Sequence, residues 1–564
     1  MSHLHRRLAM LAACTALTAP LVVHAQSLPY GDTDSASSDQ DSSGGTSSRG
    51  SGGRGHKRIT IVPYIEAAQV VDAQLKPGND VLTYSSLAAG VDAGIHGHNA
   101  EGSMSLRYER RFGWGKVRDG DVVSGAARGS IAIVPRVLTF EAGGLATRTR
   151  VEANGSTAIG GNNLGDSVSQ IYSVYAGPAL QTHVGDVAVE GHYRAGFNKV
   201  GSPHVVVSPT QAPVDIFDHS VVQNAELHAG IKPGEGLPVG VGVGAGFNQE
   251  DMSNLDQRAR DLHARADVTV PLTHDVALVG GIGYEDVTIS SRDAVRDANG
   301  NPVVGSKGHY ITDKSAPRTV AYDTSGLIWD AGVMWRPSRR TSFEARYGRR
   351  YGSTSVSGNF AYAPSDRTAI NASVYDNVAG FGSQLTNALA QMPADFQMVR
   401  NPLTGDMSGC VSSLDKGNCL SGVLGSVRSS TFRARGGSAS ISHSLGRMSA
   451  GLAVGYDRRR YVAAPGTALA FANGVVDESV WVASYFGAKL DQRSSLTANV
   501  YANWFQSGFA STGDGTGIGA NAAYSRSITD HLSASAALGI DGISRETLDD
   551  VWNASALVGV RYSF

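Results

Sequence analysis

The C-terminal stretch VWNASALVGVRYSF (residues 551–564) decides the fold class. An apolar or aromatic side chain stands at every second position, at Trp552, Ala554, Ala556, Val558, Val560, Tyr562 and Phe564. This period of two is typical of a β-strand with one apolar face. From Trp552 to Tyr562 the strand rises roughly 25 Å, at ~3.3 Å per residue and a tilt of ~40°. That height matches the band between the aromatic girdles of a membrane barrel.

The same alternation recurs along the chain. Between residues 103 and 112, Leu106, Tyr108 and Phe112 take one parity, and Arg107 and Glu109 take the other. Similar runs lie at 187–198 and 262–270, and the apolar positions of 239–247 alternate with glycines. Many runs span about 9–11 residues, the length that crosses a bilayer at a tilt, whereas soluble strands average about 5–6. The pattern therefore favours a transmembrane barrel over a soluble sandwich.

The composition agrees with an all-β chain. Charged residues make up 17% of the 564 residues, whereas soluble proteins average about 25%. Glycine supplies 69 residues, about 12% of the chain, whereas its usual share is about 7%. So much glycine disfavours a helical protein, and 41% hydrophobic residues disfavour disorder of the whole chain. The net charge of −2 gives no sign of a nucleic-acid partner.

Three segments are predicted. Residues 1–25 read as a secretory signal peptide, with a basic start, an apolar run from Leu8 to Val23 and cleavage before Gln26. A lipoprotein signal ending at Cys14 is the alternative, but its apolar stretch would have only six residues. Residues 26–57 form a Ser/Gly-rich disordered linker, and residues 58–564 form the barrel. No later run is long and apolar enough for a transmembrane helix.

Connection lengths predict the number of strands, because barrels of this kind alternate short periplasmic turns with longer outer loops. Five long connections stand out, at 150–169, 199–217, 291–319, 376–428 and 460–478. Ten short turns and eleven outer loops predict a single antiparallel up-and-down barrel of about 22 strands with both chain ends in the periplasm. The short turns are expected at His96–Glu101, Pro135–Arg136, His183–Asp186, Lys232–Leu237, Pro271–Asp275, Arg336–Arg340, Pro364–Asp366, Gly446–Arg447, Asp491–Arg493 and Thr529–His531.

Charged side chains on the polar parity are the candidate site residues. Lining a lumen, they would either set a field that selects anionic solutes or form a network that ties the inner wall together. The two interpretations stay open. The residues are Arg107, Glu109, Arg111, Arg128, Arg194, Arg265, Asp267, Glu344, Arg346 and Arg350.

Other motifs carry little chemistry. Cys410 and Cys419 are predicted to form a disulfide in the longest outer loop, since Cys14 leaves with the signal peptide. Histidines such as His192 and His263 read as polar lumen residues, because no nucleophile–base arrangement accompanies them. We therefore expect no enzyme, no metal and no cofactor.

Two resemblances add to this. The strand ending at Phe564 resembles the C-terminal strand that the barrel assembly machinery reads in bacterial outer-membrane proteins, which makes Tyr562 and Phe564 an assembly signal. The segments WRPSRRTS (335–342) and YGRRY (347–351) resemble outer-membrane barrels that accompany exosortase (PEP-CTERM) and exopolysaccharide systems in Gram-negative bacteria, over about residues 322–376. With its Ser/Gly-rich tail and the segment DGISR (541–545), the whole chain resembles a group of barrels from sphingomonad-type bacteria. Some of these are labelled preprotein-translocase subunit YajC, which is a small one-helix inner-membrane protein unlike this chain.

Two functions remain open at this stage. One is a passive pore or export channel in the Gram-negative outer membrane, for exopolysaccharide or small anionic solutes. The other is a structural or surface-adhesion barrel that acts through its extracellular loops. The expected partners are outer-membrane lipid, the barrel assembly machinery and exopolysaccharide or small solutes, with no nucleic acid.

Overall fold

The computed structural model describes residues 58–151, 157–158, 168–201, 216–305, 309–412, 418–419, 423–509, 513–546 and 549–564. The signal peptide and linker predicted at 1–57 lie outside the described residues. Within these ranges, none of the helices has the length and apolar character needed to span a membrane.

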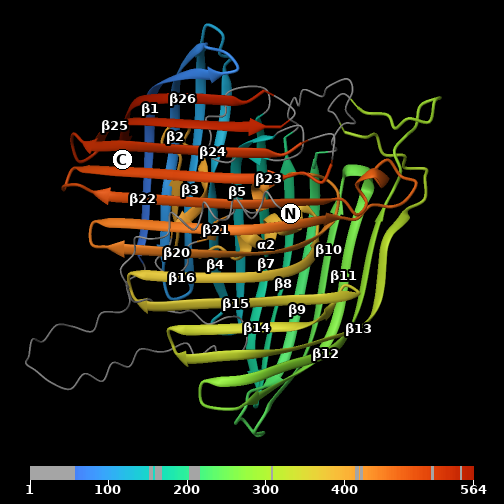
Figure 1. Ribbon diagram of the computed structural model, residues 1–564. Helices are drawn as coiled ribbons and strands as arrows, with labels where there is room; N and C mark the ends of the chain where they lie inside the picture. The colour runs from blue at the N-terminus through green and yellow to red at the C-terminus, as the bar shows by residue number, and fades with distance from the viewer. Residues whose placement is uncertain are drawn as a thin grey trace, which may run out of the picture.

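Twenty-two long strands form the wall of the molecule (Figure 1). They are β1 (Arg58–Lys76), β2 (Val81–His96), β3 (Ala100–Trp114), β4 (Gly120–Val134), β5 (Leu138–Val151), β7 (Val168–Val184), β8 (Val187–Val200), β9 (His219–Ile231), β10 (Gly240–Met252), β11 (Gln257–Pro271), β12 (Val276–Ser291), β13 (Thr319–Ser338), β14 (Thr341–Arg350), β15 (Ser353–Ser365), β16 (Thr368–Ala379), β20 (Phe432–Leu445), β21 (Met448–Tyr461), β22 (Val476–Lys489), β23 (Ser494–Gln506), β24 (Gly515–Ser527), β25 (Leu532–Arg545) and β26 (Val551–Ser563).

These strands close into one barrel. Each pairs antiparallel with its neighbour in the chain, and β26 pairs with β1 from Tyr64–Ser563 to Lys76–Trp552. In Figure 1 the strands of the near and far walls cross steeply, as expected when all strands tilt against the barrel axis. The predicted 22-stranded up-and-down barrel is confirmed, and the ten short turns lie where they were expected.

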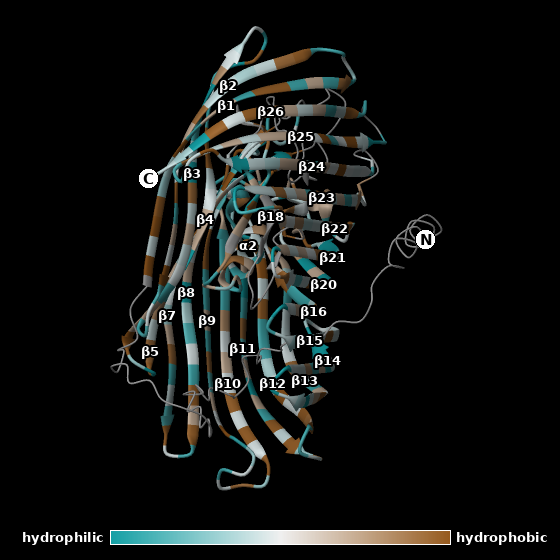
Figure 2. Ribbon diagram, turned by 90° about the vertical axis from the view of Figure 1, so that its left-hand side faces the viewer, coloured by the Kyte–Doolittle hydropathy of each residue, from teal (hydrophilic) through white to brown (hydrophobic). Residues whose placement is uncertain are grey.

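The period of two separates an apolar outer face from a polar inner face. On β3, Leu106, Tyr108 and Phe112 are exposed on the outside, whereas Arg107 and Glu109 are buried on the inside. Figure 2 shows this alternation as bands of hydrophobic and hydrophilic residues along the strands. An outer wall of exposed apolar side chains suits lipid, and closure leaves no unpaired strand edge within the sheet.

The two ends of the barrel differ. The short turns gather at one end, where β1 begins and β26 ends, so that the Phe564 amide donates to the Pro63 carbonyl. The longer connections gather at the other end, including 292–318 between β12 and β13 and 462–475 between β21 and β22.

One long connection enters the barrel. Residues 380–431, which we call the luminal insert, join β16 to β20 and contain α2 (Phe381–Ala390), β17 (Gln397–Arg400), β18 (Met407–Ser412), β19 (Asn418–Cys419) and the 3-10 turn η2 (Val423–Gly425). Figure 2 shows α2 and β18 between the walls of the barrel. The remaining short elements are β6 (Thr157–Ala158), η1 (Asn254–Asp256) and η3 (Ala470–Ala472).

Candidate functional site

The luminal insert gives the barrel an apolar core inside its polar lumen. Phe381, Leu385 and Leu389 recur every four residues, so they share one face of α2, and none is exposed. This face packs into one cluster with inward side chains of β5, β7 and β8. The cluster includes Leu145, Ile171, Tyr175, Val200, Phe217 and Met252.

Glu250, from β10, fixes the start of α2. Its carboxylate accepts the backbone N–H groups of Gly380, Gly382 and Ser383, each at 3.0 Å. These are among the first N–H groups of a helix, which have no partner within the helix and favour negative charge. Further along α2, Asn198 of β8 donates to the Thr386 hydroxyl at 3.0 Å. Glu250 is 1% exposed, so this carboxylate serves the insert rather than solvent.

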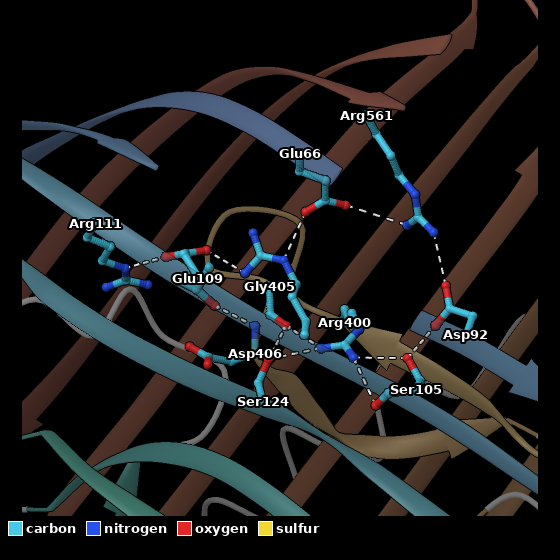
Figure 3. Close-up of polar contacts among 12 residues, drawn as sticks. Glu66, Asp92, Ser105, Glu109, Arg111, Ser124, Arg400, Gly405, Asp406 and Arg561 are labelled. Atoms are coloured by element: carbon cyan, nitrogen blue, oxygen red, sulfur yellow. Dashed lines mark hydrogen bonds and ion pairs between the residues drawn. The ribbon is translucent and has the colours of Figure 1, made fainter. Parts of the chain in front are cut away.

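A second anchor lies at Arg400, near the centre of Figure 3. Its guanidinium donates to the Ser124 hydroxyl at 3.0 Å, to the Ser105 hydroxyl at 2.9 Å and to the Gly405 carbonyl at 2.7 Å. Gly405 has a φ of +68°, and a Cβ there would collide with the guanidinium of Arg107. This close approach requires glycine, and it presses the turn of the insert against β3 and β4.

A third anchor is the buried pair of Arg148 on β5 and Asp406 in the insert. Their side chains are 8% and 2% exposed, and two hydrogen bonds of 3.1 and 2.5 Å join them. Burial raises the pKa of the Asp406 carboxyl, but the guanidinium of Arg148, its hydrogen bonds and the nearby Arg111 outweigh burial, so the pKa lies below its ordinary value. Asp406 is therefore ionised at neutral pH and holds Arg148.

Behind these anchors, the first predicted charges form a network on the barrel wall. Arg107 pairs with Glu109 and, at 2.9 Å, with Glu66 of β1. Arg111 also pairs with Glu109. Arg561 of the last strand reaches Glu66 at 3.5 Å, so the network crosses the β1–β26 closure (Figure 3).

Arg128 and Arg194 share a carboxylate on the same side of the barrel. Both pair with Glu141 of β5, at 3.4 and 2.5 Å. Their side chains are 19% and 21% exposed.

Arg265 and Arg346 lie on the facing part of the wall. Arg265 on β11 and Arg346 on β14 share Asp330 of β13 at 2.9 and 2.8 Å, and Arg346 also pairs with Glu344. Asp267 contacts His228 at 3.1 Å.

Arg350 is the last residue of β14, at the long-loop end of the barrel. Its guanidinium reaches Asp261 at 2.8 Å and Glu285 at 3.5 Å.

The glycine-rich strand β10 makes room for two imidazoles. Gly242 and Gly246 face the lumen, where a Cβ would meet the rings of His228 and His263 respectively. These glycines therefore keep the lumen face of β10 small.

The covered and facing parts of the lumen wall differ in exposure. Under the insert, Arg107, Glu109 and Arg111 are at most 8% exposed. On the facing part, Arg265 and Asp330 are 27% and 22% exposed, Arg346 is 13% exposed, and the inward serines of β20, at 438, 440 and 442, are half-buried. Arg128 and Arg194, at 19% and 21%, lie between these extremes. All seven predicted arginines face the interior and are ion-paired, and whether they select solutes stays a prediction.

The remaining candidate residues have separate places. Tyr562 and Phe564 are exposed on the outer face, 41% and 64%, with ring centroids 5.1 Å apart. Their role as an assembly signal stays a prediction. The backbone places Cys410 directly opposite Cys419 across β18 and β19, but their side chains lie outside the described residues, so the disulfide also stays a prediction.

Several residues of the site were not predicted from the sequence. Glu250, Arg400, Asp406 and Asp330 act through partners that are distant in the chain. A usable signal did exist for α2, because the spacing of Phe381, Leu385 and Leu389 is helical. Among the described residues, no cluster of His, Cys, Asp and Glu has metal-binding geometry.

Comparison with known proteins supplies no family. No protein-family model matches the sequence, and none of the curated proteins is similar to it. The resemblance to exosortase-associated barrels therefore stays an expectation.

Solved structures of outer-membrane barrels resemble the chain at low similarity. The FrpB iron transporter from Neisseria meningitidis (F5-1 variant) aligns at 10% identity and a TM-score of 0.41, over 89% of this chain and 82% of that one. The ferric-catecholate import receptor Fiu from E. coli K12, in its open form, gives 10% identity and a TM-score of 0.40, over 89% and 81%. OprD of Pseudomonas aeruginosa gives 9% and 0.28, over 89% and 95%. Values this low carry no functional argument, so the function has to be argued from the barrel itself.

Proposed function

We propose that the chain is an outer-membrane diffusion channel for small polar solutes, narrowed by its luminal insert. The observation that carries this proposal is the contrast between the two parts of the lumen wall. The insert is anchored to β3–β10, to Gln257 at the start of β11 and, through Arg459 and Arg428, to β21 and β22. The inward side chains of β13 and β14, and those of β11 and β20 nearer the short turns, remain polar and partly exposed. The lumen of a 22-stranded barrel is wide, and in outer-membrane transporters of this size it is plugged. Here the insert between β16 and β20 partly fills the lumen.

The exposed wall suits small hydrated solutes. Hydroxyl groups of serine and paired charges offer hydrogen bonds without a strong binding site, which a diffusion channel needs if solutes are to leave again. Its arginines 265, 346 and 350 are all paired with carboxylates, so we expect weak selectivity rather than strong preference for anions. Export of exopolysaccharide, the other channel role considered, would require the insert to move out of the lumen.

The orientation follows from the two unlike ends. Short turns of barrels of this kind lie in the periplasm and longer loops lie outside. We therefore propose that Phe564 and the start of β1 are periplasmic. Single cysteines at Ser315, in a long loop, and at Thr273, in a short turn, test this: on whole cells, a membrane-impermeant maleimide should label only the first.

Planar-bilayer recordings on the purified full-length protein test the channel. We expect stable conductance steps, and proteoliposomes that swell in small sugars but not in oligosaccharides. A correctly folded protein, shown by its heat-modifiable migration, that gives no conductance would contradict the channel and favour the structural barrel. Swelling that continues with long oligosaccharides would instead indicate an insert that does not narrow the lumen.

A further inference from the structure

The barrel wall has a notch above the hairpin of β14 and β15. Pairing between β13 and β14 stops at Trp329, although β13 continues beside β12 up to Thr319. Likewise, pairing between β15 and β16 stops at Val374, although β16 continues beside β20 up to Ala379. The short hairpin is therefore the floor of a notch at the long-loop end of the barrel.

Five arginines on the outer face border this notch, and we call them the rim arginines. They share the parity of exposed outward side chains on the same strands, such as Tyr347 on β14, Ile441 on β20 and Tyr456 on β21. The rim arginines are Arg349, Arg433, Arg435, Arg458 and Arg460.

Strand register concentrates these charges. Arg433 lies directly opposite Arg460 across β20 and β21, and Arg435 lies opposite Arg458. Like charges in directly opposed positions destabilise a sheet unless a counter-charge is present. Two carboxylates pair with the rim arginines among the described residues. Asp376 pairs with Arg433 and Arg435, and Glu478 pairs with Arg458.

Five arginines against two carboxylates leave an excess of three positive charges on one outward patch. The patch has a clear border, because across the notch the exposed outward side chains Asp286 on β12 and Asp323 on β13 are acidic. The excess is therefore local to the rim arginines.

The rim arginines differ in their hydrogen-bond partners. Arg433 and Arg435 donate to the carbonyl of Thr354, and Arg433 also donates to that of Tyr351, so these two hold the hairpin. Arg349 and Arg460 are exposed, and neither guanidinium group has a hydrogen bond or ion pair with any residue that the structure describes. These two, with the 40% exposed Arg458, present their guanidinium groups to the surroundings.

The patch lies at the level where a bilayer turns polar. Arg349 is in register with Trp329, whose ring packs on Tyr347 with centroids 6.3 Å apart. Aromatic pairs of this kind mark the membrane interface, and the exposed side chains beside and below them, Val356 and Val374, are apolar. The rim arginines therefore stand at headgroup height.

We propose that the rim arginines bind the phosphate of an outer-leaflet lipid headgroup. Guanidinium groups bind phosphate with charge-assisted, often bidentate hydrogen bonds, and a lipid is the phosphate source that a membrane-facing patch at this height meets. The notch gives the headgroup space above the hairpin. This proposal rests on the proposed orientation of the barrel and is independent of solute passage.

Native mass spectrometry of the detergent-purified full-length protein tests the proposal, with three probes: diphosphorylated lipid A, the same lipid with its phosphates removed, and sodium phosphate. We expect the phosphorylated lipid to bind far better than the other two. The variant Arg349→Gln, Arg458→Gln, Arg460→Gln should bind it about a hundredfold more weakly. Arg110→Gln is the matched control, since Arg110 is also an outward arginine, 40% exposed, near the long-loop end of β3, and should leave binding unchanged.

Three results would overturn the proposal. They are equal binding of the phosphate-free lipid, full competition by sodium phosphate, and equal weakening by Arg110→Gln. If the triple variant does not fold, Arg460→Gln alone decides, because among the described residues this side chain has no hydrogen bond or ion pair to lose, and the change should still weaken binding several-fold. Channel conductance of either variant should equal that of the wild type, which separates failure here from failure of the proposed function.

Discussion

The covered and the facing parts of the lumen wall are built from the same residue types but have different surroundings. On β3, Arg107 is packed beneath the insert with Glu66 and Glu109, and it has lost nearly all contact with water. On β11, Arg265 makes a similar pair with Asp330 but keeps 27% of its side-chain surface. The difference shows that an arginine on the polar parity becomes structural or solute-facing according to whether the insert covers it.

The largest expected effect comes from breaking a buried pair under the insert. Asp406→Ala leaves Arg148 buried without its partner, which costs about 3–5 kcal/mol because the charge is no longer compensated. Hydrogen exchange of residues 400–407 should accelerate strongly while the barrel strands stay protected. The matched change on the facing wall, Asp330→Ala, should cost much less because water reaches Arg265 and Arg346. Equal effects of the two variants would contradict the distinction between covered and facing walls.

A somewhat smaller effect is expected at the start of α2. Glu250→Gln keeps the shape of the side chain and one acceptor oxygen but puts an NH2 donor in place of the other oxygen, so at least one of the three N–H groups loses its partner, at a cost of about 1–3 kcal/mol. Exchange protection of residues 381–390 should fall, and that of residues 400–407 should fall less. Unchanged protection of α2 would show that its apolar face alone holds it in place.

The pH dependence of the insert follows from Asp406. Because its pKa is lower in the folded protein than in an unfolded chain, the pair with Arg148 contributes its full stability above the ordinary aspartate pKa of about 3.9. That contribution is lost as the pH falls below this value and through the lower folded-state pKa. The exchange protection of residues 400–407, corrected for the intrinsic pH dependence of amide exchange, should therefore be constant from pH 7 to 5 and fall only below about pH 4. Asp406→Asn should remove this acid transition. A loss of protection at residues 400–407 already at pH 6 would show that protonation of Asp406 does not cause the transition.

The smallest expected effect concerns ion selectivity. Arg265→Gln, on the facing wall, should move the reversal potential slightly toward cations, and the shift should shrink at 1 M salt, where the screening length is about 3 Å. Arg107→Gln, under the insert, should leave selectivity unchanged while lowering stability. A larger selectivity shift from Arg107→Gln than from Arg265→Gln would reverse the assignment of the two walls.

The barrel was predictable because each strand carries its own signal. Alternation on strands such as residues 103–112 reflects lipid on one side and a polar lumen on the other, so no long-range information is needed. Turn positions such as Gly446–Arg447 followed from connection length alone. For the same reason, the inward direction of Arg107 and Arg346 was correct from parity.

The luminal insert was not predictable in the same way. Nothing local tells a loop of 52 residues, 380–431, to fold inward, because its anchors Glu250 and Arg148 lie more than one hundred residues away in sequence. The partners of the predicted arginines were hidden for a related reason. Strand tilt and barrel closure bring Arg561 close to Glu66. The alternation of residues along a strand predicts which face a side chain is on, but not which residue of another strand lies next to it.

The central claim is that the insert narrows a conducting lumen, and the conductance of a chain without it tests this most directly. In the variant, a short Gly/Ser linker replaces residues 382–428, and the control variant shortens the long connection between β12 and β13 at 298–313. We expect a single-channel conductance several-fold above wild type for the first variant and equal to wild type for the second. An insert-free barrel that folds normally but conducts no more than the wild type would contradict it.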